Sequence, residues 1–148
     1  MRIAVGSDHA GFELKEAVAA HVRDAGHEVV DCGTYSADRV DYPDFGAAVG
    51  RSVAGGDTEG GICVCGTGIG IAMAANKIAG IRAGVVWDAT SARLTREHND
   101  ANVICIGERL VGPQVALDAV DAWLASTFDG GRHVGRVAKL DALGGERV

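Results

Sequence analysis

Residues 61–71 read Gly-Ile-Cys-Val-Cys-Gly-Thr-Gly-Ile-Gly-Ile and pass from an apolar run through a glycine-rich turn toward a helix. The run Gly61–Cys65 has the near-continuous apolar character of a strand that is covered on both faces, as strands of parallel sheets are. Helix-like sequence, Ile71–Lys77, follows the turn. A strand, a short turn and a helix in this order are typical of a βαβ unit, so the stretch predicts an α/β fold.

Strand-like and helix-like segments alternate over the rest of the chain as well. The expected strands are Arg2–Ser7, Glu28–Asp31, Gly61–Cys65, Arg82–Val86 and Val103–Ile106. The expected helices cover residues 12–22, 44–54 (capped by Asp44), 71–77, 90–98, 113–126 and 135–143. These elements predict a three-layer, Rossmann-like α/β sandwich in which helices cover both faces of a five-stranded parallel sheet. No linker or repeat divides the 148 residues, so we expect one domain.

The composition disfavours several classes of protein. Aromatic residues make up 5% of the chain and the formal net charge is −6, which argues against binding to single-stranded or duplex nucleic acid. No run of about 18 apolar residues could cross a membrane, and the chain begins on a strand rather than an apolar leader. We therefore expect a cytoplasmic protein with free thiols. Cys63 and Cys65 have zinc-ligand character, but no second ligand pair has suitable spacing.

Ligands of open α/β sheets bind beyond the carboxyl ends of the strands. Chemically informative residues follow four of the expected strands, in the segments Ser7–His9, Cys65–Gly68, Trp87–Asp88 and Gly107–Arg109. Because these ends meet along one edge of a parallel sheet, we expect a ligand site at that edge. Asp8 and His9 would present a carboxylate and an imidazole to it.

The turn Cys65–Gly70 is the strongest local signal. Its alternating glycines let a ligand approach the backbone, and the amides before the helix can stabilise a phosphate or an enolate oxygen. A dinucleotide-binding loop would need its third glycine one place later, and a phosphate-binding loop would need Lys-Ser/Thr after the second glycine. A cysteine phosphatase loop would need an arginine where Ile71 and Ala72 stand. Amides at the start of a helix favour the thiolate form of Cys65. Its alternative role is that of a buried structural thiol, which we expect for the other three cysteines.

Imidazole and guanidinium groups in the second half of the chain are further candidates. His98 ends a helix, where the helix dipole favours its cation and lets it donate a proton, but a capping histidine has the same position. Arg132 and Arg136 are four residues apart and share one face if that piece is helical, where they could grip a phosphate or form a solvated basic end. The remaining histidines are expected at the surface: His21, His27 and His133.

Six motifs together resemble the type B ribose-5-phosphate isomerases, in the family that also holds galactose-6-phosphate isomerase subunits. The matching segments are Gly6–Phe12, Asp41–Pro43, Cys65–Gly70, Ala74–Lys77, Glu97–Asp100 and Gly130–His133. They occur in the family's order and run from residue 6 to about residue 136. A sister branch lacks the cysteine and uses a glutamate six residues later, where this chain has Ile71, so the chain is more similar to the cysteine branch.

The resemblance implies an enzyme of the pentose phosphate pathway that interconverts D-ribose 5-phosphate and D-ribulose 5-phosphate without a metal or other cofactor. It implies that Cys65 moves the proton between carbons 2 and 1, and that His98 opens the furanose ring. The other implied contacts are Asp8, Tyr42 and Asn99 at the sugar, Thr67 with the amides of Gly66, Gly68, Ile69 and Gly70 at the enediolate, and His9, Arg109, Arg132 and Arg136 at the phosphate.

The resemblance also implies a homodimer with sites shared between subunits, and it leaves open whether dimers pair into tetramers. A C-terminal segment, about residues 127–148, would bring its arginines to the partner's pocket. One alternative is an isomerase for a related hexose 6-phosphate or tetrose phosphate, of the allose, galactose or erythrulose type. Another is a non-catalytic sugar-phosphate sensor, which would keep the glycine loop and the arginines but would need neither Cys65 nor His98.

Overall fold

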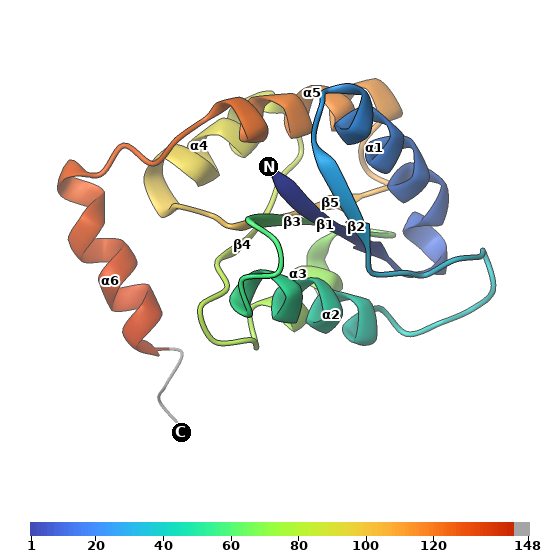
Figure 1. Cartoon of the computed structure of the whole chain (residues 1–148), viewed down its shortest axis with the longest axis horizontal. Helices are drawn as coiled ribbons and strands as arrows, with labels where there is room; N and C mark the ends of the chain where they lie inside the picture. The colour runs from blue at the N-terminus through green and yellow to red at the C-terminus, as the bar shows by residue number, and fades with distance from the viewer. Residues whose placement is uncertain (144–148) are drawn as a thin grey trace.

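The computed structural model describes residues 1–143, and its centre is a five-stranded sheet in which neighbouring strands are parallel (Figure 1). The strands are β1 (Arg2–Ser7), β2 (Glu28–Asp31), β3 (Gly60–Cys65), β4 (Ala83–Val85) and β5 (Val103–Gly107). The α-helices are α1 (Phe12–Asp24), α2 (Tyr42–Ala54), α3 (Ile69–Ala75), α4 (Ala89–Asn99), α5 (Pro113–Ala125) and α6 (Val134–Leu143), and two short 3-10 helices are η1 (His9–Gly11) and η2 (Gly131–His133). The predicted fold class is confirmed. Within residues 1–143, no helix has both the length and the apolar character needed to cross a membrane.

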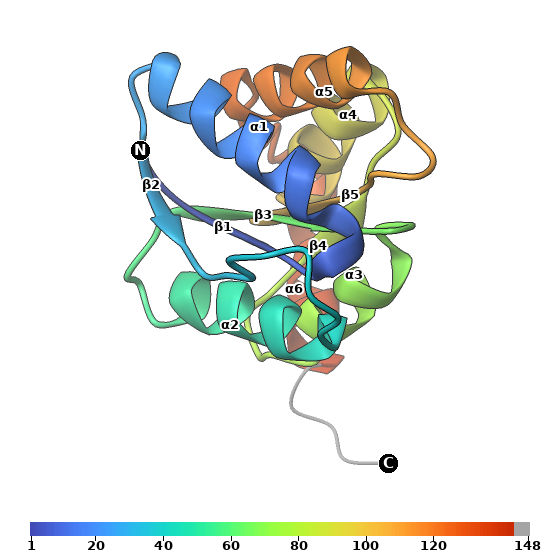
Figure 2. The same ribbon diagram turned by 90° about the vertical axis from the view of Figure 1, so that its right-hand side faces the viewer.

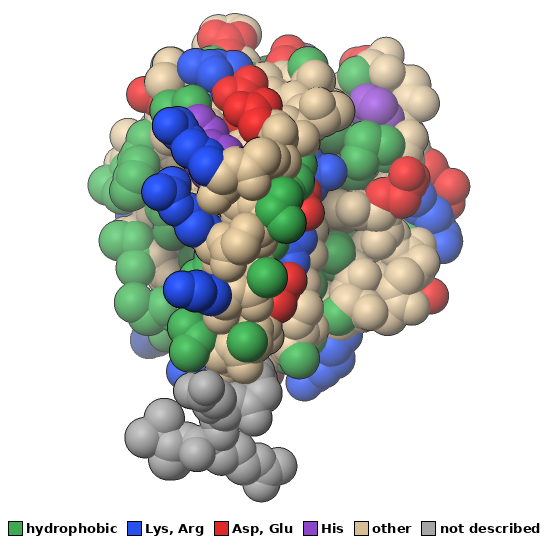
Figure 3. Space-filling model, turned by 90° about the vertical axis from the view of Figure 1, so that its left-hand side faces the viewer, with side chains coloured by type: hydrophobic (Ala, Val, Ile, Leu, Met, Phe, Trp, Pro, Cys, Tyr) green, Lys and Arg blue, Asp and Glu red, His purple; other side chains and the backbone are tan. Residues whose placement is uncertain are grey.

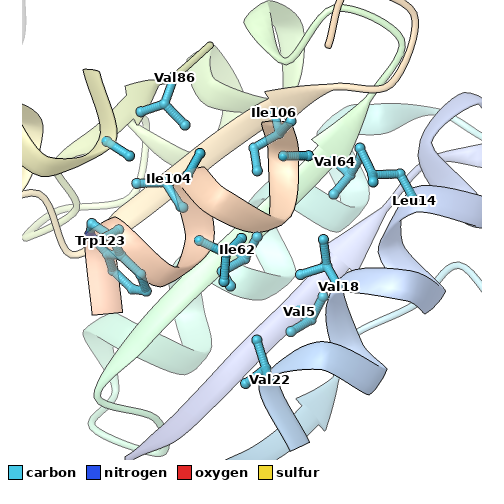
Figure 4. Close-up of a cluster of buried hydrophobic side chains, with 14 of the residues drawn as sticks. Val5, Leu14, Val18, Val22, Ile62, Val64, Val86, Ile104, Ile106 and Trp123 are labelled. Carbon is cyan, nitrogen blue, oxygen red and sulfur yellow. The ribbon is translucent and has the colours of Figure 1, made fainter. Parts of the chain in front are cut away.

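Helices cover both faces of the sheet, with α1, α4 and α5 on one face and α2 and α3 on the other (Figure 2). Successive strand residues point to opposite faces, so β3 contributes to two cores. Ile62 and Val64 pack under α1 and α5, in the cluster shown in Figure 4, while Cys63 and Cys65 face α2 and α3. Each fully buried aliphatic side chain contributes about 1.5–3 kcal/mol. This burial fixes which way β3 faces, and therefore places the sulfur of Cys65 on the α3 side.

The order of the strands, β2-β1-β3-β5-β4, creates a point where the chain reverses its direction of growth across the sheet. From β1 the chain goes to β2 on one side and then returns to β3 on the other side. The connections that leave β1 and β3 therefore diverge, and a crevice opens beyond their carboxyl ends. The structure places η1 and the glycine-rich turn at this crevice.

Helix α2 begins at Tyr42 rather than at Asp44, and its N-terminal cap residue is Asp41. The predicted cap is therefore wrong by three residues. Pro43 explains the difference, because its fixed φ suits the first turn of a helix and needs no amide hydrogen bond. Asp44 lies in that first turn, where its negative charge is favourable near the helix N-terminus.

A buried lysine fixes the connection that follows β2. The side chain of Lys15 is fully buried, and its Nζ donates to the carboxylate of Asp31 at 2.8 Å and to the carbonyl oxygen of Thr34 at 2.9 Å. The amide of Ser7 donates to Gly33 at 2.6 Å, which ties the same connection to the end of β1. A buried charge with these partners is costly to disrupt, by about 3–5 kcal/mol. The connection is thus held beside the crevice.

Candidate active site

A pocket of about 210 Å³ lies at the carboxyl edge of β1, β3 and β5. Its lining residues are Asp8, His9, Ala10, Tyr42, Cys65, Gly66, Thr67, Gly70 and Arg109. Eight of these nine were expected at one ligand site from the sequence, and only Ala10 was not. Residues from four separate parts of the chain therefore converge where the strand order predicts a ligand.

Cys65 is the last residue of β3 and lines the pocket with 4% of its surface exposed. The amide of Gly68 donates to its sulfur at an N···S distance of 3.1 Å. An N–H group that points at a sulfur stabilises negative charge on that sulfur. The thiol is thus buried among apolar residues on one side, yet it reaches the pocket on the other.

The turn after Cys65 depends on glycine at two positions. Gly68 has a φ of 76°, and a Cβ there would lie 2.9 Å from the backbone carbon of Ile106. A Cβ on Gly70 would lie 2.8 Å from the ring of Tyr42. Both glycines allow a close approach that another residue would prevent. The hydroxyl of Thr67 accepts a hydrogen bond from the amide of Ile69 at 3.2 Å, which fixes that side chain at the pocket.

The segment after β1 supplies a carboxylate and an imidazole. One carboxylate oxygen of Asp8 accepts hydrogen bonds from the amides of Ala10 and Gly11 at 3.0 and 3.1 Å, so Asp8 caps η1. Nδ1 of His9 lies 3.1 Å from the carbonyl oxygen of Val40. These contacts orient both side chains before any ligand binds.

Arg109 completes the pocket from the β5 side. Its amide donates to the carbonyl oxygen of Gly66 at 3.0 Å. A Cβ on Gly66 would lie 3.3 Å from a guanidinium nitrogen of Arg109, so the guanidinium passes directly over this glycine. The pocket therefore contains a cationic group from this chain, as an anionic ligand requires.

The other three cysteines are placed differently from Cys65. Cys63 and Cys105 are paired in the register of β3 and β5 and are fully buried. Burial raises the pKa of Cys105 well above its ordinary value, and it raises the pKa of half-buried Cys32 to about 11. These two thiols stay protonated near neutral pH, and none of the three lines the pocket.

Four other predicted residues, His98, Asn99, Arg132 and Arg136, lie together with His133, and we call these five residues the histidine cluster. His98, in the last turn of α4, stacks on His133 with ring centroids 4.5 Å apart and planes at 10°. Nε of Arg132 donates to Nε2 of His133 at 3.3 Å. Figure 3 shows histidine side chains beside a row of basic side chains on this side of the molecule.

His133 is not a surface residue, because only 7% of its surface is exposed, and that expectation was wrong. The other two histidines that were expected at the surface have partners there. Nε2 of His21 is hydrogen-bonded to the carboxylate of Asp121 at 2.6 Å, and Nδ1 of His27 lies 3.3 Å from the N-terminal amine. His133 belongs to the motif Gly130–His133, which was the only sequence signal for it. His133 does not follow the carboxyl end of a strand, so the expectation that ligand residues lie there did not identify it.

The histidine cluster lies near the amino ends of the strands, whereas the pocket lies at their carboxyl ends. Helix α4 runs antiparallel to the strands, and the segment just beyond it meets the beginning of β3, where Asn102 accepts a hydrogen bond from the amide of Gly61 at 2.9 Å. Cys65 ends that same strand, whose six residues span roughly 17 Å at about 3.3 Å per residue. Figure 1 shows α6 and the end of α4 on the left and, on the right, the start of α1, which follows the pocket residues Asp8, His9 and Ala10.

Ring nitrogens of His98 and His133 and the carboxylate of Asp129 lie within 4.8 Å of one another, a grouping that can hold a metal ion. The geometry is nevertheless unfavourable for a metal ion. Parallel stacked imidazoles direct their in-plane lone pairs side by side rather than toward one ion. Arg132 already donates to His133, and the positive charges of Arg132 and Arg136 act on the same ring.

Comparisons with known proteins identify similar sequences and structures. The family model described as Ribose/Galactose Isomerase matches residues 3–140. Ribose-5-phosphate isomerase B of Escherichia coli strain K12 is 51% identical over 142 residues, which cover 96% of this chain and 95% of the relative. The structure of Clostridium thermocellum ribose-5-phosphate isomerase B matches with a TM-score of 0.95 at 50% identity and covers 97% of each chain. A galactose-6-phosphate isomerase subunit of Clostridium acetobutylicum is 39% identical and is matched over 86% of this chain and 74% of its own length.

Proposed function

Because the chain belongs to the ribose/galactose isomerase family, we propose that it interconverts D-ribose 5-phosphate and D-ribulose 5-phosphate through an enediolate. The observation that carries this proposal is the pocket in which the thiol of Cys65, the amides of the glycine turn and the cation of Arg109 meet. Isomerisation needs one base that serves two adjacent carbons and donors where negative charge develops. The pocket supplies both. The high identity to a relative named ribose-5-phosphate isomerase B supports the choice of sugar.

Proton transfer in this proposal begins on the open-chain aldose. Cys65 takes the proton from carbon 2, and the electron pair of that C–H bond forms the double bond between carbons 1 and 2. The aldehyde oxygen becomes an enediolate oxygen, which Thr67 and the amides of Gly66, Gly68, Ile69 and Gly70 stabilise. The proton then returns to carbon 1, the hydroxyl at carbon 2 becomes the ketone, and its proton passes to the neighbouring oxygen. Asp8 and Tyr42 hold the sugar during these steps.

Ring opening is assigned to His98, and this assignment requires a second subunit. The base and the ring-opening acid must each come within hydrogen-bond distance, about 3 Å, of atoms one or two bonds apart. In one chain, roughly 17 Å of strand separates the two edges that carry them. We therefore propose a homodimer in which the partner subunit supplies His98 and Asn99 to each pocket.

The same arrangement provides the phosphate site. His9 and Arg109 of one chain would meet Arg132 and Arg136 of the partner subunit, so that several cations offset the net charge of −6. The segment 127–148 would thus reach the partner, although residues 144–148 lie outside the described part of the chain. Three further expectations stay predictions: the pairing of two dimers into a tetramer, the organisation of the chain as a single catalytic domain, and a cytoplasmic location.

Exposed apolar side chains support the dimer. β4 is at the edge of the sheet, and near it Met73 and Trp87 are 63% and 52% exposed. A groove of about 530 Å³ lies between α6 and the β4 region, with Leu140 and Leu143 in its lining. Large exposed apolar side chains around an edge strand are typical of a surface that another chain covers.

A turnover panel in heavy water tests the proposed function. We expect the highest kcat/KM with ribose 5-phosphate, and a six-carbon 6-phosphate to be at least about tenfold slower, because an extra carbon must fit the same pocket. The ribulose 5-phosphate formed should carry deuterium at carbon 1 by NMR. A higher kcat/KM for a hexose or tetrose phosphate would move the assignment to a related isomerase, as the galactose-6-phosphate isomerase relative suggests. The absence of both turnover and exchange at carbon 2 would leave the sensor alternative.

A further inference from the structure

His133 is the described residue whose ring lies against the proposed ring-opening acid. The rings of His133 and His98 are stacked at 4.5 Å and are nearly parallel, at 10°. His133 is 7% exposed and ends η2, so its position is set by the fold, whereas His98 is only partly buried in the last turn of α4. The stack therefore defines the plane of the His98 ring.

The hydrogen bond from Arg132 determines the protonation state of His133. A guanidinium group only donates, so Nε2 of His133 must accept at the 3.3 Å N···N distance and the ring proton sits on Nδ1. Loss of hydration, together with the charges of His98, Arg132 and Arg136, lowers the pKa of His133, and Asp129 opposes this shift. His133 is then a neutral ring near neutral pH. A neutral ring can lie against a protonated His98 without charge repulsion, and its π face attracts that cation.

We propose that His133 is a positioning residue that holds the imidazole of His98 in the orientation needed to protonate the ring oxygen of the sugar. This inference rests on the proposed function, in which His98 opens the furanose. It adds the reason why His98 can act from the end of a helix: the stack limits the rotation of its ring, which would otherwise misdirect its proton. A small misplacement of a catalytic group costs about 100-fold in rate.

The test compares His133→Phe with His133→Leu. Phe keeps a flat ring against His98, whereas Leu fills similar space without a π face. Each variant is assayed with ribose 5-phosphate and with 4-deoxyribose 5-phosphate, which lacks the hydroxyl that closes the furanose and therefore needs no ring opening. We expect His133→Leu to lose about 10- to 100-fold in kcat with ribose 5-phosphate and less than about threefold with the deoxy sugar. His133→Phe should stay within about threefold of the parent protein on both substrates.

Three results would overturn the inference: equal losses on both substrates, normal turnover of ribose 5-phosphate by His133→Leu, or a loss in His133→Phe as large as in His133→Leu. The NMR signals of the His98 ring add an independent readout, because a stacked aromatic ring shifts them. They should move in His133→Leu and stay near their original positions in His133→Phe. If the parent protein isomerises neither sugar, the proposed function fails, which is distinct from failure of the role of His133.

Discussion

Replacing Cys65 with serine is expected to lower kcat for ribose 5-phosphate by about 1,000- to 10,000-fold, the upper part of the range of a general base. A serine hydroxyl accepts the Gly68 amide as the sulfur does, at 3.1 Å, but it does not ionise near neutral pH. The substitution changes one atom at the edge of the pocket, so the fold should persist. The loss should be equal for ribose 5-phosphate and 4-deoxyribose 5-phosphate, because both need the proton at carbon 2 removed.

Initial rates, together with the thermal unfolding midpoint, measure this effect. Cys32→Ser is the matched control, since it also replaces a cysteine with serine but lies outside the pocket, and it should retain activity within about twofold. If Cys65→Ser kept activity within about tenfold of the parent, Cys65 would not be the base.

His98→Asn is expected to have the second largest effect, a loss of about 100- to 10,000-fold in kcat with ribose 5-phosphate. Asparagine keeps a polar group at the end of α4 but cannot transfer a proton. The loss should nearly vanish with 4-deoxyribose 5-phosphate, because that sugar is never a furanose. This selectivity separates ring opening from proton transfer between carbons.

The matched comparison is with Cys65→Ser, which should fail on both sugars. An equal loss on both sugars in His98→Asn would show that His98 does not act at the ring. An equal loss would also be expected if His98 only stabilised α4. The ion pairs of Asp100 with Arg82 and Arg96, at 2.9 and 3.1 Å, already fix the end of that helix.

Much of the fold could be predicted from the sequence because buried parallel strands have a simple signature. The apolar runs of β1, β3 and β5 are buried at almost every position, and each was expected within one residue of its observed bounds. The start of α2 was missed because two aspartates compete for the cap, and the proline between them decides for Asp41. The anchoring of the connection after β2 was also missed, since nothing in the sequence marks Lys15 as a fully buried lysine.

The candidate site also has a part that was predictable from the sequence and a part that was not. Residues at or just after the ends of strands, such as Asp8, Cys65 and Arg109, were predictable because parallel strands end at one edge. The family resemblance named four residues of the histidine cluster, but their grouping around His133 was not predictable, because it depends on how η2 folds back against the end of α4. From the family resemblance, only the C-terminal arginines, Arg132 and Arg136, were expected to come from the partner subunit. The structure groups His98 with them, through His133, at the edge away from Cys65.

The shared site is the claim that links thiol, imidazole and guanidinium groups, and complementation between inactive chains tests it most directly. Cys65→Ser and His98→Asn chains, each with a different tag, are produced together, and mixed dimers are purified by both tags. Each mixed dimer should contain one pocket with an intact thiol and an intact imidazole, and so recover about half the activity of the parent dimer. A mixed dimer of Cys65→Ser and Asp8→Asn is the control, because both changes affect the same half of the site and neither pocket is complete. Recovery near one half only in the first pair is the predicted result, whereas no recovery in that pair would contradict a site built from two subunits.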